Sequence, residues 1–249
     1  MQKPFEVSTD SSQDSFTKIK GMFLNIGKVF VRIFLVIFFL QLAYMIVLKW
    51  VDPPITVTQI VSWAEGYGIK KDYVKLKDMS INAQLAAIAG EDTTFLEHHG
   101  FNFKRIEIAI WHYHHHTPQE GSSTLSQQVA KNVFLWQKGG FLRKGIETYL
   151  TIMIECIWGK KRILEVYLNV IEMGDGVFGI EAASQHYFHK SAKDLTQQEA
   201  AIIVSYLPNP RMYSEGKYPA IVASRLLTIL FHMKKFSSQP IYRQFLGMT

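Results

Sequence analysis

One long apolar run near the N-terminus stands apart from the rest of the chain. Residues 1–20 are mainly polar, whereas Val29 to Trp50 are almost all apolar and numerous enough for a helix that crosses a bilayer. The run is too long and starts too late for a cleaved signal peptide, and no small-residue cleavage site follows it. The pattern predicts a tail over 1–28 with a disordered first part, a transmembrane anchor over 29–50 and a folded domain over 51–249.

Basic residues favour one orientation of this helix. Four of them precede or enter the apolar run: Lys18, Lys20, Lys28 and Arg32. Lys49 follows it, with an acidic residue nearby. The positive-inside rule then places the N-terminus in the cytoplasm and the folded domain on the other side of the membrane.

Helical periodicity dominates the chain after an extended linker that contains Pro53 and Pro54. The predicted helices cover 80–92, 102–116, 123–135, 141–159, 160–172, 179–188, 196–207 and 219–235. The segment 141–159 is apolar over most of its circumference, so we expect a buried core helix there. Strand signals are weak, with 73–77 the best candidate, and the predicted fold class is mainly α.

Capping residues mark where several of these helices begin. Ser80 and Asn102 stand at N-cap positions, and Thr196 with Glu199 has the spacing of a capping box. We expect the helix over 123–135 to start at Ser123, after the turn that contains Gly121.

Charge and cysteine content narrow the possible partners and sites. The formal net charge is +6, which suits an anionic partner such as anionic lipid, a phosphate-bearing substrate or nucleic acid. Cys156 is the single cysteine, which excludes an intrachain disulfide and a cysteine-rich zinc site.

The segment 123–135 carries a polar stripe opposite an apolar one. Four polar residues fall at i, i+3, i+4 and i+7: Thr124, Gln127, Gln128 and Lys131. A solvated helix face is the ordinary interpretation of such a stripe, but solvated faces are typically rich in Glu and Lys. This stripe has uncharged hydrogen-bonding groups and one lysine, which also suits a polyhydroxyl or phosphate ligand. The spacing leaves both interpretations open.

Arg143, Lys144 and Glu147 form a charged group at the start of the segment 141–159. The spacing of Glu147 from the two cations is that of an ordinary ion pair within a helix. However, a carboxylate at the polar end of an apolar helix is also a candidate for a perturbed pKa. Both interpretations remain open from the spacing alone.

The stretch "AGEDTTFLEHHGFN" places Glu91 and Asp92 at the end of an apolar helix, with His98 and His99 close behind. A helix C-terminus disfavours a carboxylate, which predicts a raised pKa and a better base at Glu91. The adjacent histidines point to different faces. The second histidine group, at 112 and 114–116, has no carboxylate or cysteine at ligand spacing, so a polar helix end is favoured over a metal site.

Five motifs occur in order and carry a resemblance to a known family: "EDTTFLEHHGFN", "GSSTLSQQVAKN", "RKGIE", "KKRILEVYLN" and "GVFGIEAASQHYFHK". Together they resemble the motif set of the peptidoglycan glycosyltransferases, the lysozyme-like family shared by bifunctional penicillin-binding proteins, over about Asp78 to Tyr213. A short domain behind one anchor, with no penicillin-binding "SxxK" domain, resembles the monofunctional biosynthetic members.

The resemblance implies a reaction and a set of site residues. Lipid II, a disaccharide-pentapeptide on undecaprenyl pyrophosphate, would be the acceptor and the growing glycan chain the donor, with inversion and release of the lipid pyrophosphate. Glu91 would be the general base, and Glu147 would lie by the leaving group. The residues that match substrate-binding positions are Ser123, Thr124, Gln128, Lys131, Asn132, Arg143 and Lys144.

The resemblance also implies location, partners and a possible metal requirement. The protein would be a single-pass protein of the bacterial inner membrane, with its domain outside the cytoplasm. Its partners would be lipid II, the growing glycan chain, the membrane and other proteins of wall synthesis or division, and not nucleic acid. No cofactor is required by the motifs, and a role for Mg²⁺ or Mn²⁺ with the pyrophosphate stays open.

Three positions depart from the family pattern. Asn102 replaces the usual Asp, which an N-cap tolerates well. Ser122 replaces a small Gly or Ala, and Gly139 replaces a frequently basic residue, with Lys138 beside it. The last change puts one phosphate contact in doubt.

Two other functions compete with the transferase. A membrane-anchored lytic enzyme would share a lysozyme-like fold, but it needs no phosphate clamp such as Lys131, Arg143 and Lys144 would provide. A non-catalytic scaffold of the division or elongation machinery needs neither carboxylate. The substitution Glu91→Gln separates catalysis from scaffolding.

Overall fold

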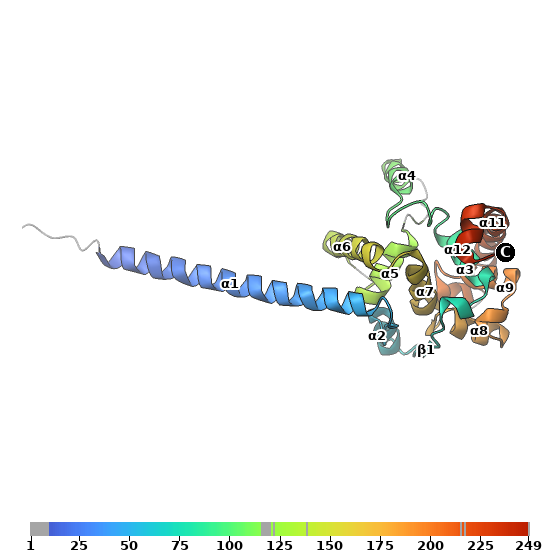
Figure 1. Ribbon diagram of the computed structural model, residues 1–249, viewed down its shortest axis with the longest axis horizontal. Coiled ribbons are helices and arrows are strands. Elements are labelled where there is room, and N and C mark those ends of the chain that lie inside the picture. Colours follow the sequence, from blue (N-terminus) through green and yellow to red (C-terminus); the bar gives the residue numbers. More distant parts are fainter. Residues whose placement is uncertain are drawn as a thin grey trace, which may run out of the picture. The chain divides into compact units, whose positions relative to one another are not determined.

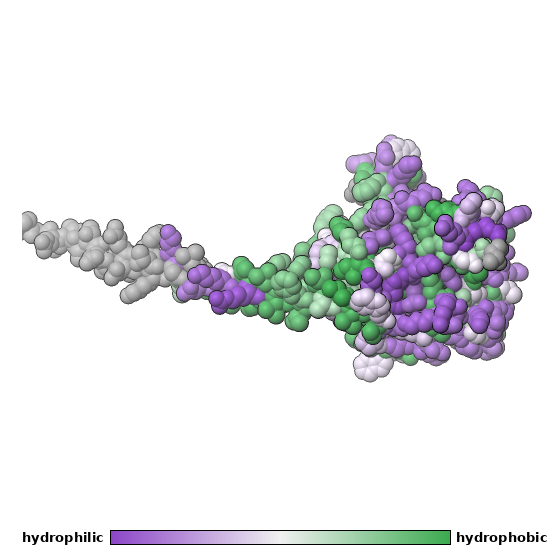
Figure 2. All heavy atoms as spheres, viewed as in Figure 1, coloured by the Kyte–Doolittle hydropathy of each residue, from purple (hydrophilic) through white to green (hydrophobic). Residues whose placement is uncertain are grey.

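The computed structural model describes residues 10–115, 121, 123–137, 139–214, 216 and 218–248, and the chain divides into two units after Leu48 (Figure 1). The first unit is a single helix, α1 (Asp10–Val47). Its segment Asn25–Val47 is long and apolar enough to cross a membrane by length and composition. Apolar side chains surround the described part of this segment (Figure 2).

The helical bounds correct two expectations at this end of the chain. Residues 10–20, predicted as part of a disordered tail, are helical, because an apolar helix once formed extends at little cost through residues that do not break it. The predicted span 29–50 is shifted: α1 ends at Val47, and 48–50 lie in a turn before Pro53.

The second unit is mainly α, as predicted. Its helices are α2 (Val57–Ala64), α3 (Ile81–Glu91), α4 (Phe103–His114), α5 (Leu125–Phe134), α6 (Phe141–Ile157), α7 (Lys160–Val170), α8 (Ile180–Phe188), α9 (Gln197–Ser205), α10 (Pro210–Ser214), α11 (Pro219–Ser237) and α12 (Pro240–Leu246). Short 3₁₀ turns, η1 (Leu76–Asp78) and η2 (Ala192–Asp194), lie between them.

A small sheet has the order β1-β3-β2 and consists of β1 (Lys70–Lys71), β2 (Glu172–Gly174) and β3 (Val177–Phe178). Strand β1 runs parallel to β3, and β2 runs antiparallel to it. The prediction of a strand over 73–77 is wrong. The Asn169 side chain of α7 hydrogen-bonds both the N–H and the carbonyl of Val74, and Glu165 accepts from the N–H of Leu76, so α7 side chains replace a neighbouring strand.

Local capping chemistry positions the helices largely as expected. The Ser80 and Asn102 side chains accept hydrogen bonds from Ala83 N and Arg105 N, and Thr196 forms a capping box with its N3 residue. Helix α5 begins at Leu125, two residues later than predicted, because Thr124 is its N-cap and forms a capping box with Gln127.

The core has two groups of helices that meet at α7. Helix α3 packs against α9 and α11, and α5 packs against α6 and α7, while α7 also contacts α3 (Figure 1). The core side chains of α7 are fully buried: Ile163, Leu164, Val166, Tyr167, Leu168 and Val170. Side chains on this central helix can therefore reach both groups.

Helix α6 is not the buried core helix that its composition predicted. Its buried stripe is narrow and consists of Glu147, Leu150, Thr151 and Ile154. Phe141 is fully exposed and Leu142 is 81% exposed. Helix α4 projects away from the two groups (Figure 1) and also exposes large apolar side chains, among them Phe103 and Trp111. The apolar residues around α6 thus form an exposed apolar surface, together with those of α4, and not a buried core.

Asp92 joins the end of α3 to the start of α5. Its carboxylate is fully buried and accepts from Leu125 N at 3.0 Å and from His98 Nε2 at 3.0 Å. The other ring nitrogen of His98 accepts from Gly100 N, and the Thr124 hydroxyl donates to the Gly100 carbonyl. Through this network Asp92 and His98 hold the loop after Glu91.

We predict that Asp92→Ala lowers the free energy of unfolding by about 3 kcal/mol, because it leaves buried donors of α5 and His98 without their acceptor. Chemical denaturation of the purified protein measures the change. Asp194→Ala removes an exposed carboxylate from η2 and should change the free energy by less than about 0.5 kcal/mol. Equal effects of the two substitutions would show that the Asp92 network does not stabilise the fold.

Candidate active site

The Glu91 carboxylate lies at the C-terminal end of α3, where other helices supply its hydrogen-bond donors. Gln128 Nε2 of α5 donates to one carboxylate oxygen at 2.9 Å, and Arg225 Nη2 of α11 donates to the other at 2.9 Å. Arg105 of α4 donates to the Glu91 carbonyl at 3.1 Å. The Glu91 side chain is 14% exposed, so the carboxylate is oriented by its neighbours yet still open to a ligand.

Burial raises the pKa of the Glu91 carboxyl above its ordinary value. The hydrogen bond from Gln128 and the charges of Arg225 and Arg105 oppose this rise. The direction agrees with the sequence-based expectation, but the main cause is burial, whereas the sequence pointed to the helix dipole. A carboxylate with a raised pKa is a better general base near neutral pH.

Tyr167 of α7 supports this arrangement from behind. Its side chain is fully buried, and its hydroxyl donates to Gln128 Oε1 at 3.4 Å. Since one end of the Gln128 amide accepts from the tyrosine, the NH₂ end is directed to Glu91. Burial raises the pKa of Tyr167 well above its ordinary value, so this hydroxyl remains a donor.

A second carboxylate, Glu147 of α6, is held by two cations of the same helix. Arg143 Nη1 donates to one oxygen at 2.7 Å, and Lys144 Nζ donates to the other. Glu147 is 2% exposed, whereas Lys144 is about half exposed. Arg143 Nε is buried and has no hydrogen-bond partner among the described residues. The cluster keeps a net positive charge and donors that can meet an anion.

Lys131 of α5 is the link between the two carboxylates. Burial lowers the pKa of its ammonium group, and the nearby carboxylates of Glu147 and Glu91 act in the opposite direction. Both acids therefore lie within electrostatic range of this one lysine. Arg143 and Lys144 also lower its pKa, so the charges of both residues act on this lysine, and the three cations are here called the cation cluster.

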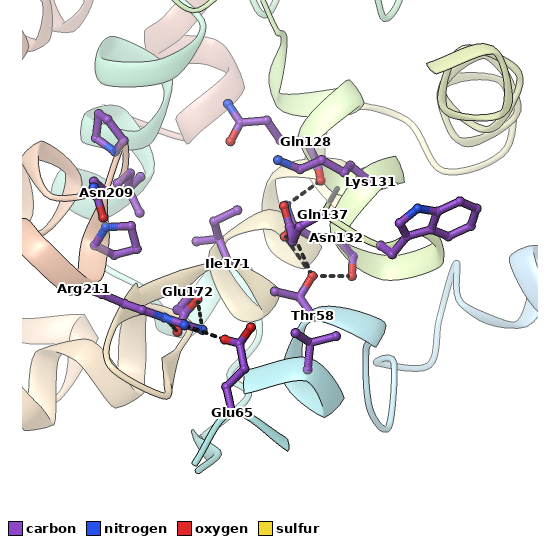
Figure 3. A pocket seen from close by; sticks show the side chains of 15 residues that line it. Thr58, Glu65, Gln128, Lys131, Asn132, Gln137, Ile171, Glu172, Asn209 and Arg211 are labelled. Carbon is purple, nitrogen blue, oxygen red and sulfur yellow. Dashed lines mark hydrogen bonds and ion pairs between the residues drawn. The ribbon is translucent and has the colours of Figure 1, made fainter. Parts of the chain in front are cut away.

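A polar cavity of about 540 Å³ opens on one side of Lys131 (Figure 3). One side of it is α5, with Gln128, Lys131 and Asn132. The other residues that line it are Thr58, Val61, Glu65, Trp136, Gln137, Ile171, Glu172, Leu207, Pro208, Asn209, Pro210 and Arg211. Amides, a hydroxyl, an indole and charged groups together suit a saccharide better than an apolar ligand.

Two hydrogen-bonded groups shape this cavity. The Asn132 side-chain carbonyl accepts from the Thr58 hydroxyl at 3.2 Å and from Gln137 Nε2 at 2.8 Å. At the other end, Arg211 binds Glu172 and Glu65, and its guanidinium lies 4.0 Å from the ring centre of Tyr67. Figure 3 shows the Thr58, Asn132 and Gln137 side chains on one side of the cavity and those of Arg211, Glu172 and Glu65 on another.

An apolar groove of about 970 Å³ lies between α4 and α6. Its lining residues are His99, Phe101, Phe103, Ile106, Ala109, Ile110, Gln127, Phe141, Lys144, Thr148 and Ile152. Lys144 thus belongs both to the groove and to the cation cluster around Glu147. The groove explains why α6 keeps apolar residues on faces that the core does not cover.

The structure separates the predicted substrate-binding residues into different kinds. Gln128, Lys131 and Asn132 line the polar cavity. Arg143 and Lys144 bind Glu147. Ser123 and Thr124 lie at the N-terminus of α5.

Thr124 has a structural role as the N-cap of α5, and its contact with substrate stays a prediction. Its side chain is fully buried, and its hydroxyl donates to Gly100 O and accepts from Gln127 N. Ser123 is half-buried beside it, and its role stays a prediction. Of the positions that depart from the family pattern, Asn102 caps α4 as expected and Ser122 lies outside the described residues, as does Lys138 beside the third position, Gly139.

The histidines that the structure describes do not form a metal site. His98 binds Asp92, and His115 stacks on Trp111 at the end of α4, while His116 lies outside the described residues. In the part of the chain that the structure describes, no three His, Cys, Asp or Glu side chains are placed to hold an ion. Glu91 is bound to Arg225, and Glu147 is bound to Arg143 and Lys144. Because their oxygens already face these cations, the two carboxylates do not fit as ligands of a resident Mg²⁺ or Mn²⁺.

Sequence reasoning missed several residues of the site. Arg225 is the clearest, since it is the one charged residue in the apolar stretch 219–233, and an isolated charge there is itself a signal. Tyr167 lies among the apolar core residues of α7, and Gln137 and Arg211 come from segments with no periodic pattern.

Comparison with known proteins adds a family to this geometry. The family model described as Transglycosylase matches residues 58–234. That range contains both carboxylates, the cation cluster, the polar cavity and Arg225.

Curated relatives match most of the chain. Three of them share the name biosynthetic peptidoglycan transglycosylase. The protein of Bdellovibrio bacteriovorus is 41% identical over 218 residues, which cover 85% of this chain and 87% of the relative. That of Escherichia coli is 45% identical over 190 residues, 75% of this chain and 78% of the relative. That of Mannheimia succiniciproducens is 47% identical over 167 residues, 67% and 68% respectively.

We predict that Arg225→Gln raises the pKa of Glu91 further, because it removes the cation that stabilises the ionised form. NMR titration of the glutamate side-chain carboxyl carbons, with the Glu91 signal assigned by Glu91→Gln, measures the shift. Lys234→Gln removes an exposed cation from the same helix and should leave the Glu91 titration unchanged. An unchanged Glu91 pKa in Arg225→Gln would refute the ion pair.

Proposed function

Because the chain belongs to the transglycosylase family, we propose that it polymerises lipid II into linear peptidoglycan glycan strands, with inversion and release of undecaprenyl pyrophosphate. Family membership makes the chain a glycosyltransferase of peptidoglycan synthesis with a lysozyme-like domain. The lipid-linked substrate, the leaving group and the roles of individual residues are our proposal.

One observation carries the choice of substrate: a single cation cluster adjoins both an apolar groove and a polar cavity. Lys144 lines the groove between α4 and α6, and Lys131 lines the cavity beside α5. A molecule with a prenyl chain, a pyrophosphate and a saccharide has the same three parts in the same order. The arrangement supports a lipid-linked sugar over a simple polysaccharide.

Glu91 is the general base of the proposed reaction. The sugar hydroxyl of lipid II is the acceptor, and its deprotonation requires a nearby group with a raised pKa. Burial supplies the raised pKa, while Gln128 and Arg225 fix the two carboxylate oxygens. The hydroxyl attacks the anomeric carbon of the growing chain as the base takes its proton.

Glu147 and its cations serve the leaving group. Pyrophosphate leaves without a proton if its charge is stabilised, and preorganised cations in a partly buried site do this well. Glu147 holds Arg143 and Lys144 in place, and Lys131 completes the cluster. Any divalent ion in this proposal is a counter-ion of the substrate pyrophosphate, because the protein carboxylates are already paired.

The polar cavity beside α5 is proposed to hold sugar units of the growing chain. Asn132 and Gln137 present amides, and Trp136 offers an exposed ring on which a sugar can stack. The anomeric end would then lie beside Lys131, between the base and the cation cluster. This placement gives the donor and the acceptor separate approaches.

Membrane attachment follows from the same substrate. The apolar segment of α1 fits an inner-membrane protein. We propose that the N-terminus is cytoplasmic and the domain extracytoplasmic, as the basic residues before the segment favour. Other proteins of wall synthesis or division, rather than nucleic acid, are the proposed protein partners.

We predict that Glu91→Gln lowers lipid II polymerisation by about 10²- to 10⁴-fold, because the amide cannot accept the hydroxyl proton. Gel separation of labelled glycan strands made by the full-length protein measures the rate. Glu97→Gln, an exposed change in the same segment, should polymerise at the wild-type rate. Wild-type rates for Glu91→Gln would refute the base and favour a non-catalytic role.

We also predict that Ile152→Ser raises KM for a long-chain prenyl substrate by roughly tenfold, because it places a hydroxyl in the apolar groove. Ile241→Ser is a matched control, since both isoleucines are 49% exposed but Ile241 lies on α12. Steady-state kinetics with the long-chain substrate compares them. If both variants keep the wild-type KM, the groove does not hold the prenyl chain.

A further inference from the structure

The chain that leaves α1 is fastened to the domain almost at once. Arg162 of α7 donates from Nη2 to the Val51 carbonyl at 2.7 Å and from Nη1 to Asp52 at 2.8 Å. Glu165 of the same helix also accepts from Arg162 Nη1. Arg162 is only 8% exposed, so this contact, here called the linker clamp, is part of the folded domain.

Further contacts extend the clamp along the linker. Lys75 donates to the second carboxylate oxygen of Asp52 at 3.0 Å, and Lys71 donates to the Pro54 carbonyl. Pro53 is buried, and Thr56 is 1% exposed as the N-cap of α2. A segment that the sequence marks as an extended linker is thus fixed from Val51 onward.

The same helix carries the clamp and a contact of the proposed base. Tyr167, whose hydroxyl donates to Gln128 behind Glu91, follows Arg162 by five residues of α7. Five helical residues span about 7.5 Å. Because Ile163, Leu164 and Val166 between them are fully buried in the core, α7 connects the linker to the Gln128–Glu91 pair without a flexible joint.

Chain length limits the distance between this clamp and the membrane segment. Helix α1 ends at Val47, and the clamp begins at Val51. Four residues reach at most about 14 Å when fully extended. The clamp therefore limits how far the domain can move from the end of the apolar segment.

We propose that Arg162 is a positioning residue that, through Val51 and Asp52, holds the Glu91 base within a short fixed reach of the bilayer surface where a lipid-linked substrate presents its pyrophosphate. The inference rests on the proposed function. It gives the clamp a role in the use of bilayer-borne substrate that is separate from the stability of the fold and from the chemistry at Glu91.

An insertion between Trp50 and Val51 tests the tether and leaves every clamp contact intact. Six Gly-Ser residues lengthen the reach by about 20 Å. The full-length protein is placed in liposomes and assayed with a long-chain lipid II in the bilayer and with a water-soluble short-chain analogue. We expect kcat/KM for the bilayer substrate to fall by about tenfold through KM, since a longer flexible tether lowers effective concentration. The short-chain substrate should keep its wild-type kcat/KM.

Two further variants complete the test. The same six residues inserted after Gly247 should affect neither substrate. Asp52→Ala, which removes one clamp contact and keeps the original chain length, should raise KM for the bilayer substrate less than the insertion does. Arg162→Ala is not used, because it would leave the half-buried carboxylates of Asp52 and Glu165 without their cation and destabilise the domain.

The outcomes separate the two proposals. Equal losses on both substrates after the Trp50–Val51 insertion would show a structural effect and overturn the tether, and so would no loss on either. If the wild-type protein forms glycan from neither substrate, the proposed function fails and this inference fails with it.

Discussion

The buried carboxylate of Asp92 is the interaction on which the site depends. A buried charge is costly unless it is paired and hydrogen-bonded, so the donors from Leu125 and His98 must be present whenever the domain is folded. These donors fix the end of α3 against the start of α5. Glu91 precedes Asp92, and Gln128 is one turn after Leu125, so their 2.9 Å contact follows from this one anchor.

The two carboxylates differ because their surroundings differ. Glu91 has one neutral donor and one cation and is buried enough for its pKa to rise, which suits proton transfer. Glu147 binds two cations of its own helix, which suits the organisation of charge around a leaving group. The charges of both carboxylates act on Lys131, which lines the polar cavity, whereas Lys144 beside Glu147 lines the apolar groove. A substrate that is part lipid and part sugar would bring its reacting bond to this boundary.

Local chemistry was predictable from the sequence, and long-range contacts were not. Ser80, Asn102 and Thr196 cap helices as expected, because capping needs only residues a few positions apart. The pairing of Glu91 with Arg225 joins residues 134 positions apart, and no periodic pattern encodes it.

The errors have physical causes as well. Helix α6 was expected in the core because periodicity reports how apolar a helix is, not whether protein or another apolar phase covers it. The strand expected over 73–77 is absent because side chains of α7 satisfy the backbone of Val74 and Leu76. The substrate contact of Thr124 stays a prediction, and in the structure its hydroxyl bonds the backbone at the N-cap of α5.

The most direct test of the account compares two substrates for the purified wild-type protein. Labelled lipid II and isolated peptidoglycan sacculi are incubated with it separately, and glycan polymer, undecaprenyl pyrophosphate and soluble fragments are quantified. The account predicts polymer from lipid II, with one lipid pyrophosphate released for each new glycosidic bond, and intact sacculi. Cleavage of the sacculi without polymer from lipid II would contradict it and would identify a lytic enzyme instead.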